Sequence, residues 1–430
     1  MPRFLHLADI HLGYNKYDNP QRTMDFFRAL RDVVERYAIG EQVDFVLIVG
    51  DLFEYRNILP ATLNQAQVCL DLLREANIPV VAVEGNHDYE PFGTKASWLR
   101  YLADWDRLIL LDPESPDRLE PWTAETKQGG YIDLDCGVRL IGSRWYRSSA
   151  PQMLARLATA IEQLPSGPDH TVMLLHHGLE GQIARYTGAL RYADLLPLQQ
   201  AGVDYLALGH IHKHYQEQGW IYNPGSLEAN SIVEGRDQMV RGVYLVDLNG
   251  QGIQAELKQD YYQRAILRLS LTVNRDQTRK DLEATAIALI QTMADRGETQ
   301  TKIVELRIQG QVGFNRLDLN VRDLQKTLHQ ISRALIFLVK YDVAGTRYES
   351  PISRTGEGEL PTRGEIERMV FLDLIAAYSE YQGQGEAIVA QMRQLKEEIL
   401  AKKSELGAKK EEGRAISELY TIVEGLMAQR

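Results

Sequence analysis

Hydrophobic runs alternate with short polar clusters through the first half of the chain. The runs cover residues 3–8, 43–50, 78–85, 171–175 and 204–209. Their apolar residues are consecutive rather than alternating, which is typical of strands covered on both faces by other layers. Residues 23–37 and 60–77 instead repeat apolar positions at helical spacing and predict helices that cover the sheet. The pattern therefore predicts a layered α/β fold.

A polar cluster follows each run at the point where the predicted strand ends. These clusters are Asp9 with His11, Asp51, Asn86 with His87, His176, and His210 with His212. Because ligands gather beyond the carboxyl ends of strands in layered sheets, we expect all five clusters at one edge. Gly50, Gly85 and Gly209 precede three of the clusters, where we expect positive φ angles to turn the chain.

The residue types in these clusters predict a particular chemistry. Carboxylate oxygens and imidazole nitrogens bind divalent ions, and two ions about 3.5 to 4 Å apart need one carboxylate that bridges them. Asp51 is the natural bridge. Taken singly, an Asp-x-His or Asn-His-Asp pattern is more often structural, and His6 within its strand is predicted to be a core residue. The ordered set of clusters nevertheless predicts a two-metal phosphoesterase centre.

The motifs that contain these residues resemble a known family. In order they are Asp9-Ile10-His11, Gly50-Asp51-Leu52-Phe53, Gly85-Asn86-His87-Asp88, His176-His177-Gly178 and Gly209-His210-Ile211-His212, and they resemble the signature of calcineurin-like metallophosphoesterases. The segment from Leu7 to Gly13 is most similar to SbcD-type nucleases, the nuclease subunits of SbcCD complexes. The resemblance covers about residues 1–250 and implies a layered β-sandwich flanked by helices.

The resemblance also implies a role for each residue. It divides the ligands of two divalent ions, usually manganese, into Asp9, His11 and His212 for one ion, Asn86, His176 and His210 for the other, and Asp51 for both. It makes His87 the residue that stabilises the transition state or protonates the leaving oxygen. Asp88 is expected to orient an imidazole. Glu54 stands where archaeal and eukaryotic relatives usually have histidine, so the role of that position stays open. His177 and His214 are expected to be structural or to lie just outside the metal ligands.

Composition narrows the class of protein. The 430 residues predict two or three domains. The lack of a long apolar run and of a signal peptide, together with only two cysteines, Cys69 and Cys136, predicts a cytoplasmic protein without disulfides. A net charge of −11 means that local basic patches, the ions or a partner must attract DNA. Candidate DNA contacts are Lys16, Arg56, Arg144, Arg185 and Lys213, with Lys95, Arg147 and Arg191 considered beside them.

The remainder of the chain has a different pattern. A strand at 242–248 followed by an Asn249-Gly250 turn is expected to end the nuclease domain, residues 1–250. Residues 263–349 predict a β-α-β-α-β capping domain whose first helix opens with a capping box at 274–277 and faces inward with Leu282, Ala286, Leu289 and Met293. A Gly- and Pro-containing linker at 350–364 leads to a helical segment at 365–430 with heptad-like apolar spacing.

These segments define the expected partners. By resemblance, the capping domain selects DNA ends, the helical segment binds an SMC-like coiled-coil ATPase of the SbcC type, and helices near the first motifs form a homodimer. Packing within the chain is the alternative for all three, and self-association is a further alternative for the helical segment. The favoured function is a metal-dependent DNA exonuclease and endonuclease that acts at DNA ends and hairpins. A phosphoesterase of small or cyclic nucleotides, or a scaffold without activity, are the alternatives.

Overall fold

The computed structural model describes residues 1–182, 189–234, 239–250 and 252–345, with Arg368, Ala390 and Gln394 as single helical residues beyond them. The linker at 350–364 and nearly all of the helical segment at 365–430 lie outside the described residues. The chain divides into two compact units, Met1–Ile266 and Leu267–Arg430. Among the described residues, no helix is both long and apolar enough to cross a membrane.

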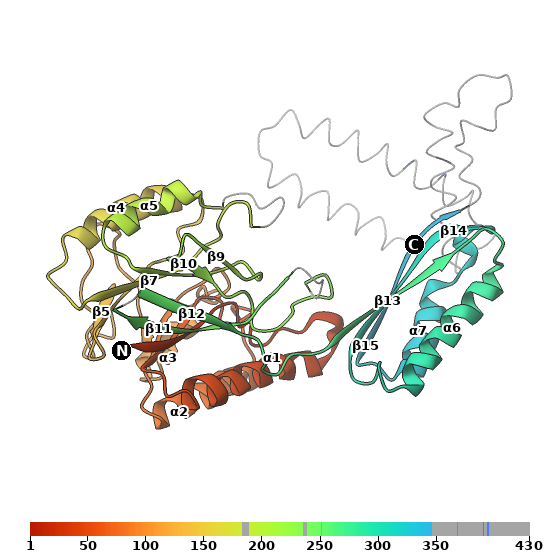
Figure 1. Cartoon of the computed structure of the whole chain (residues 1–430), viewed down its shortest axis with the longest axis horizontal. Coiled ribbons are helices and arrows are strands. Elements are labelled where there is room, and N and C mark those ends of the chain that lie inside the picture. Colours follow the sequence, from red (N-terminus) through yellow and green to blue (C-terminus); the bar gives the residue numbers. More distant parts are fainter. Residues whose placement is uncertain are drawn as a thin grey trace, which may run out of the picture. The chain divides into compact units, whose positions relative to one another are not determined.

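The first unit contains two six-stranded sheets packed face to face (Figure 1). In spatial order, the first sheet consists of β12 (Gly252–Lys258), β11 (Val243–Asn249), β1 (Arg3–Leu7), β2 (Phe45–Val49), β3 (Val80–Val83) and β4 (Ile109–Leu110). The second consists of β5 (Tyr131–Leu134), β6 (Val138–Gly142), β7 (His170–His176), β8 (Tyr205–Gly209), β10 (Ile221–Asn223) and β9 (Tyr215–Glu217).

Strands β1 to β4 run parallel, as do β6, β7, β8 and β10. Their registers align the carboxyl ends: Val49 pairs with Val83 in the first sheet, and His176 pairs with Gly209 in the second. This alignment places the loops after β1, β2, β3, β7 and β8 at one edge of the sandwich.

Helices cover the outer face of each sheet (Figure 1). On the first sheet these are α1 (Pro20–Val33), continued by a π-helical segment Val34–Ile39, α2 (Pro60–Glu75) and α3 (Trp98–Asp104). On the second they are α4 (Ala150–Glu162) and α5 (Tyr192–Gln200), and 3₁₀ turns form at Lys16–Asp18 and Arg147–Ser149. Along β1, Leu5 and Leu7 pack under the helices, whereas Phe4 and Ala8 pack between the sheets. The predicted layered α/β sandwich is confirmed.

One strand was missed by the sequence pattern. Strand β11 is followed by β12, which pairs with it in antiparallel register from Val243–Lys258 to Asn249–Gly252. The strand at 242–248 was expected to be the last strand of the domain, but β12 follows it in the same sheet. Strand β12 lies at the sheet edge and alternates half-buried Ile253, Ala255 and Leu257 with polar residues, so it lacks the continuous buried apolar run that identified the other strands.

The second unit has the expected β-α-β-α-β order. It comprises β13 (Ile266–Val273), α6 (Arg279–Asp295), β14 (Ile303–Val312), a 3₁₀ turn at Arg316–Asp318, α7 (Val321–Ser332) and β15 (Ile336–Gly345). Two details differ from the prediction. The capping box of α6 is formed by Thr278 and Asp281 rather than at 274–277, because these two residues exchange side-chain to backbone bonds of 3.2 and 2.9 Å. Ile290 is buried in place of Leu289 and Met293, which are half-buried.

Candidate metal centre

Backbone hydrogen bonds bring the first two clusters together. The backbone N–H groups of Ile10 and His11 both donate to the carbonyl of Asp51 at 3.0 Å, so the loops after β1 and β2 run side by side. The backbone N–H of His210, after β8 in the other sheet, donates to the Asp9 carboxylate at 2.9 Å. The edge of one sheet is thus tied directly to the edge of the other.

The backbone is unusual at four predicted ligands. Asp9, His11, Asp51 and His210 have φ angles of 52°, 51°, 54° and 84°. This left-handed region costs a non-glycine residue about 1 to 3 kcal/mol, and such strain concentrates at functional sites. The close spacing of strand end and ligand therefore forces the ligand residue itself to make the turn.

Glycine is required before the clusters for two different structural reasons. Gly50 has a φ of 79°, as expected for a turn. Gly85 and Gly209 lie outside the positive-φ region, so the expectation for them was wrong. A Cβ at Gly85 would lie 2.1 Å from Asp51 Oδ1, and one at Gly209 would lie 2.2 Å from the Val49 carbonyl oxygen. These two glycines provide space for their neighbours.

The first ligand group consists of Asp9, His11 and His212. The two Nε2 atoms of His11 and His212 lie 3.1 Å apart. Each outer nitrogen faces a carboxylate: His11 Nδ1 lies 2.8 Å from Glu54, and His212 Nδ1 lies 3.2 Å from Glu234. His212 Nδ1 hydrogen-bonds to Glu234, so in its neutral tautomer the Nε2 lone pair points toward His11 Nε2, into a space that a cation would stabilise.

The second ligand group consists of Asp51, His176 and His210, with the side chain of Asn86 between the histidines. His176 Nδ1 donates to the Val49 carbonyl at 2.8 Å, which leaves its Nε2 3.2 Å from Asn86 Oδ1 and 3.3 Å from Asp51 Oδ2. His210 Nδ1 lies 2.7 Å from the same Asn86 oxygen. Asp51 Oδ2 also lies 3.9 Å from His11 Nε2, so this carboxylate faces both groups. The donor set suits two divalent ions.

Burial and charge set the protonation of these residues. Asp9, Asp51 and His176 are at most 2% exposed. Burial raises the pKa of Asp9; it also opposes ionisation of Asp51, but His176 and His11 hold the pKa of Asp51 below its usual range. Burial lowers the pKa of His210 to about 3, so its imidazole is neutral at pH 7. Burial disfavours the charged form of His176 as well, yet Asp51 raises its pKa to about 9. A divalent ion would replace that proton.

His87 lies beside both groups without belonging to either. Its side chain is 34% exposed, its backbone N–H donates to Asp51 Oδ1 at 2.8 Å, and its ring centre is 5.0 Å from that of His11. The Nδ1–H donates to the backbone carbonyl of Glu54 at 2.7 Å, which turns Nε2 away from that carbonyl. Glu54 therefore contacts His87 through its backbone and His11 through its carboxylate.

Asp88 was expected to orient an imidazole, and this expectation was wrong. Its carboxylate accepts the backbone N–H groups of Asp51, Gly85 and Phe53 at 2.7, 3.0 and 3.2 Å. Burial and the nearby Asp51 carboxylate raise its pKa to about 6. Asp88 thus holds the loop that carries Asp51 against the end of β3.

The predicted DNA contacts are placed differently from one another. Arg56 and Lys16 are exposed, with their charges 4.8 and 5.7 Å from the rings of Tyr89 and Tyr17. Arg144 is bound internally, because its guanidinium donates to Asp112 at 3.1 Å. Lys213 is half-buried directly after His212. Arg185 lies outside the described residues.

Other histidines have structural partners. His6 is buried, with Nδ1 2.9 Å from the Tyr205 hydroxyl and Nε2 3.0 Å from the Leu208 carbonyl. His177 Nε2 lies 3.3 Å from the Arg147 carbonyl, and His214 Nε2 lies 2.6 Å from the Tyr244 hydroxyl. Both cysteines are free thiols.

Glu234 is a site residue that the sequence did not reveal. It lies in the loop after β10, accepts the backbone N–H of Asn230 at 2.9 Å and faces His212 Nδ1. Neighbouring Ile232 and Val233 have no strand or helix periodicity that would single it out. Only tertiary structure brings this carboxylate to the ligand.

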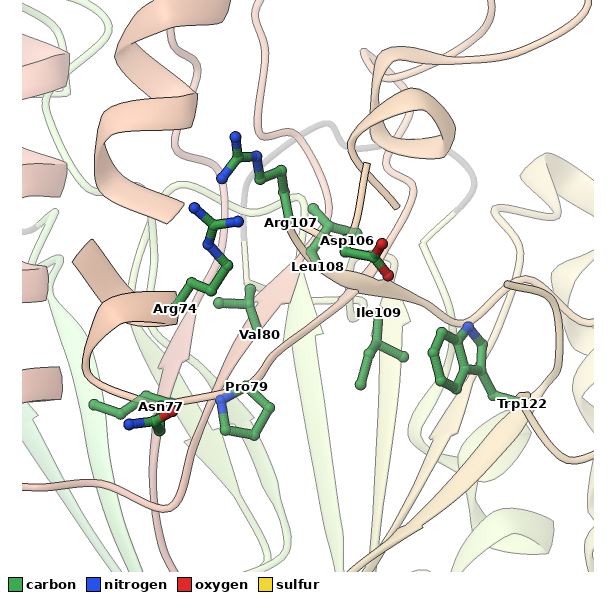
Figure 2. A pocket seen from close by; sticks show the side chains of 10 residues that line it. Arg74, Asn77, Pro79, Val80, Asp106, Arg107, Leu108, Ile109 and Trp122 are labelled. Atoms are coloured by element: carbon green, nitrogen blue, oxygen red, sulfur yellow. The ribbon is translucent and has the colours of Figure 1, made fainter. Parts of the chain in front are cut away.

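A pocket of about 330 Å³ lies at the opposite, amino-terminal ends of β3 and β4 (Figure 2). Its charged groups have internal partners: Arg74 and Arg107 both pair with Asp71, and Asp106 pairs with Lys127. It is lined by Arg74, Asn77, Ile78, Pro79, Val80, Asp106, Arg107, Leu108, Ile109 and Trp122. None of the predicted metal ligands lines it.

Comparison with known proteins agrees with this geometry. Residues 2–214 match the profile of the family described as calcineurin-like phosphoesterase. The first unit is therefore similar to calcineurin-like phosphoesterases over this stretch. That matched stretch includes every predicted ligand and His87.

Curated relatives extend the comparison. The chain is 33% identical over 250 residues to the DNA double-strand break repair protein Mre11 of Archaeoglobus fulgidus, which covers 55% of this chain and 54% of the relative. It is 24% identical over 398 residues to the protein of the same name from Sulfurisphaera tokodaii, covering 88% and 90%. An uncharacterized metallophosphoesterase, YhaO of Bacillus subtilis, is 26% identical over 269 residues and covers 60% of each chain. Apart from the second relative, these matches span about half to three-fifths of the curated proteins.

Proposed function

We propose that this protein is a metal-dependent phosphodiesterase of the Mre11 and SbcD type that hydrolyses DNA at ends and hairpins during double-strand break repair. The observation that carries the proposal is the position of Asp51, whose Oδ2 lies 3.9 Å from His11 Nε2 in one ligand group and 3.3 Å from His176 Nε2 in the other. A two-metal phosphoryl-transfer site requires a carboxylate that is shared between the two groups of metal ligands.

The chain's own residues have distinct tasks in this proposal. Two divalent ions, manganese by preference, would polarise the phosphoryl oxygens and lower the pKa of the attacking water. The residues that would hold them are Asp9, His11 and His212, then Asn86, His176 and His210, with Asp51 in common. In its protonated form His87 keeps its Nδ1–H on the Glu54 carbonyl and donates its Nε2 proton to the departing oxygen. Glu54 and Glu234 fix the tautomers of His11 and His212.

DNA is the proposed substrate because of the relatives and of the chain beyond the phosphoesterase domain. Several matching proteins are named DNA double-strand break repair proteins, and one of them matches over 398 residues, far beyond the phosphoesterase profile. In this proposal residues 1–250 form the nuclease domain, and residues 263–349 form a capping domain that selects DNA ends. An enzyme that hydrolyses small or cyclic nucleotides would not need a second unit of this kind.

The proposal includes two partners. The heptad-like apolar spacing of residues 365–430 suits a helical segment that binds the coiled-coil base of an SMC-like ATPase of the SbcC type, joined through the linker at 350–364. Helices α1 and α2 would form a homodimer contact. Leu59, directly before α2, and nearby Tyr55 support this contact because they are 71% and 51% exposed.

A paired hydrolysis assay tests the proposal. The purified protein is incubated with manganese and linear duplex DNA that has one open end and one hairpin end. A parallel reaction contains a cyclic nucleotide instead. We expect manganese-dependent DNA hydrolysis and little turnover of the cyclic nucleotide. Turnover of the cyclic nucleotide alone would support a small-molecule phosphodiesterase instead, and activity on neither would overturn the assignment.

A further inference from the structure

Four side chains form an aromatic and guanidinium cluster next to the second ligand group: Arg56, Tyr89, Trp145 and Arg147. The guanidinium of Arg56 lies 4.8 Å from the centre of the Tyr89 ring. The guanidinium of Arg147 lies 5.2 Å from the same ring and 5.4 Å from the ring of Trp145. The two rings meet edge to face with their centres 5.7 Å apart. Each contact is worth about 0.5 to 1 kcal/mol at an exposed position, so the four side chains order one another.

The cluster grows out of the loops that carry the metal ligands. Arg56 lies on the loop that follows Asp51, and Tyr89 follows His87 by two residues. The ring of Trp145 lies 6.5 Å from the ring of His210. His177, which follows His176, contacts the backbone carbonyl of Arg147 at 3.3 Å. The cluster therefore lies on the rim of the site beside His210.

Arg147 has a strained backbone. Its φ of 52° is in the left-handed region, although the residue is neither glycine nor asparagine. The contacts to His177, Tyr89 and Trp145 hold the arginine in this conformation. Strain of this kind persists where the surrounding structure fixes a side chain for a task.

The charges of Arg56 and Arg147 are available to a ligand. In the part of the chain that the structure describes, neither guanidinium pairs with a carboxylate, and both residues are exposed. Neighbouring arginines differ: Arg144 donates to Asp112, and Arg156 of α4 donates to Asp117 at 2.6 Å. In a chain with a net charge of −11, two guanidinium groups left without carboxylates at the rim of a phosphoesterase site favour an anionic ligand.

We propose that Arg56 and Arg147, held in place by Tyr89 and Trp145, bind a second phosphate of a polynucleotide chain, next to the phosphate that is hydrolysed. The inference rests on the proposed function and narrows its substrate to chains with adjacent phosphodiesters. Because guanidinium groups already lie against both rings, the rings serve to position the arginines rather than to stack a base. A mononucleotide or a cyclic nucleotide has no adjacent phosphate and gains nothing from this subsite.

The test combines protein variants with neutral phosphates. Arg147→Ala, Arg56→Ala and the control Arg156→Ala, whose guanidinium has its own carboxylate, are compared with the native protein. Substrates are a single-stranded oligonucleotide, versions of it with one methylphosphonate at each position near the cut, and bis(p-nitrophenyl) phosphate. Salt dependence of oligonucleotide binding without metal gives a second readout that does not involve catalysis.

The expected result is specific to one position. Arg147→Ala should raise the KM for the oligonucleotide about tenfold, leave bis(p-nitrophenyl) phosphate hydrolysis unchanged, and reduce the salt slope by about 0.7 per lost contact. With the native protein, a methylphosphonate beside the cut should raise the KM for the oligonucleotide by a similar factor. With Arg147→Ala, the same methylphosphonate should cause no further rise. Trp145→Leu should reproduce part of the Arg147→Ala effect. Arg156→Ala should behave like the native protein.

Other results would overturn the inference. Equal losses of activity on the oligonucleotide and on bis(p-nitrophenyl) phosphate would mean that the cluster has a structural role only. If the effects of the variant and of the methylphosphonate are independent at every position, Arg147 binds no phosphate near the cut. No change in KM or salt slope would also overturn it. If the native protein hydrolyses both substrates while these results are found, only the inference fails. If it hydrolyses neither, the proposed function fails with it.

Discussion

At the scale of single residues, the outer partners of the histidines define the centre as much as the ligands do. Glu234 and the Val49 carbonyl accept from the Nδ1 of His212 and His176, and the Glu54 carboxylate lies 2.8 Å from the Nδ1 of His11. This arrangement selects one tautomer and makes the inward nitrogen a stronger ligand. His210 is the exception, since its Nδ1 faces Asn86.

Removing these carboxylates should weaken metal binding. We expect Glu234→Gln and Glu54→Gln to reduce manganese affinity about 10- to 100-fold, because His212 and His11 lose the charge that strengthens their Nε2 atoms. Isothermal titration calorimetry on the metal-free protein measures this. Glu120→Gln is the matched control, since the exposed Glu120 carboxylate pairs with exposed Arg118. Unchanged affinity in both site variants would contradict the role of the two carboxylates.

The convergence of the predicted ligands could be foreseen from the sequence because each cluster follows a buried apolar run. Their outer partners could not, because Glu234 comes from a loop without periodicity and reaches His212 only through the fold. The role of Asp88 was wrong for a related reason. Sequence adjacency to His87 pointed to an imidazole, but the folded loop presents backbone N–H groups of Asp51 and Phe53 instead.

At the scale of elements, buried strands were predictable and edge elements were not. Strands β1, β2, β3, β7 and β8 are hydrophobic because helices and the opposite sheet cover them. Strand β12 lies at an edge and alternates apolar Ile253, Ala255 and Leu257 with polar residues, so it lacks the continuous apolar run by which the other strands were predicted. The start of α6 was misplaced because Asn274 and Gln277 form a local turn that resembles a capping box.

The buried His6 in β1 should make the stability of the first unit depend on pH. Burial lowers the pKa of His6 to about 3, whereas the unfolded chain has the ordinary value of 6.5. Between these values the unfolded state binds the extra proton. The contribution of His6 is therefore complete above pH 6.5 and is lost at about 1.4 kcal/mol per pH unit as the pH falls toward 3.

Urea unfolding of native protein and of His6→Gln at pH 7.5 and pH 5 tests this prediction. The glutamine variant should be less stable at pH 7.5, because it loses the fit to Tyr205 and Leu208, but should lose about 2 kcal/mol less than native protein on going to pH 5. Identical pH dependence of the two proteins would contradict it.

At the scale of the whole molecule, the proposed tasks fall on parts that the sequence separates. The first unit contains every predicted ligand, and the second unit contains no group of clustered metal-type residues among those described. The heptad-like spacing beyond residue 365 was read from the sequence alone. Partner binding should therefore be separable from metal binding.

Deletion of residues 365–430 tests this separation. The shortened protein should lose co-purification with a co-expressed coiled-coil ATPase of the SbcC type, because the proposed helical contact is gone, while it binds manganese with native affinity. A shortened protein that still co-purifies with the ATPase would contradict the assignment of this segment. Loss of manganese binding would mean that the segment supports the metal centre.

The most direct measurement is manganese-dependent hydrolysis of linear duplex DNA by native protein, Asp51→Asn and His87→Ala. Asp51→Asn should abolish hydrolysis and reduce manganese binding, since Asp51 faces both ligand groups. His87→Ala should reduce kcat by about 10² to 10⁴ at unchanged manganese stoichiometry, because in the proposed mechanism His87 donates a proton and is not a ligand. Circular dichroism confirms that both variants are folded. Native rates of DNA hydrolysis in either folded variant would contradict the two-metal account.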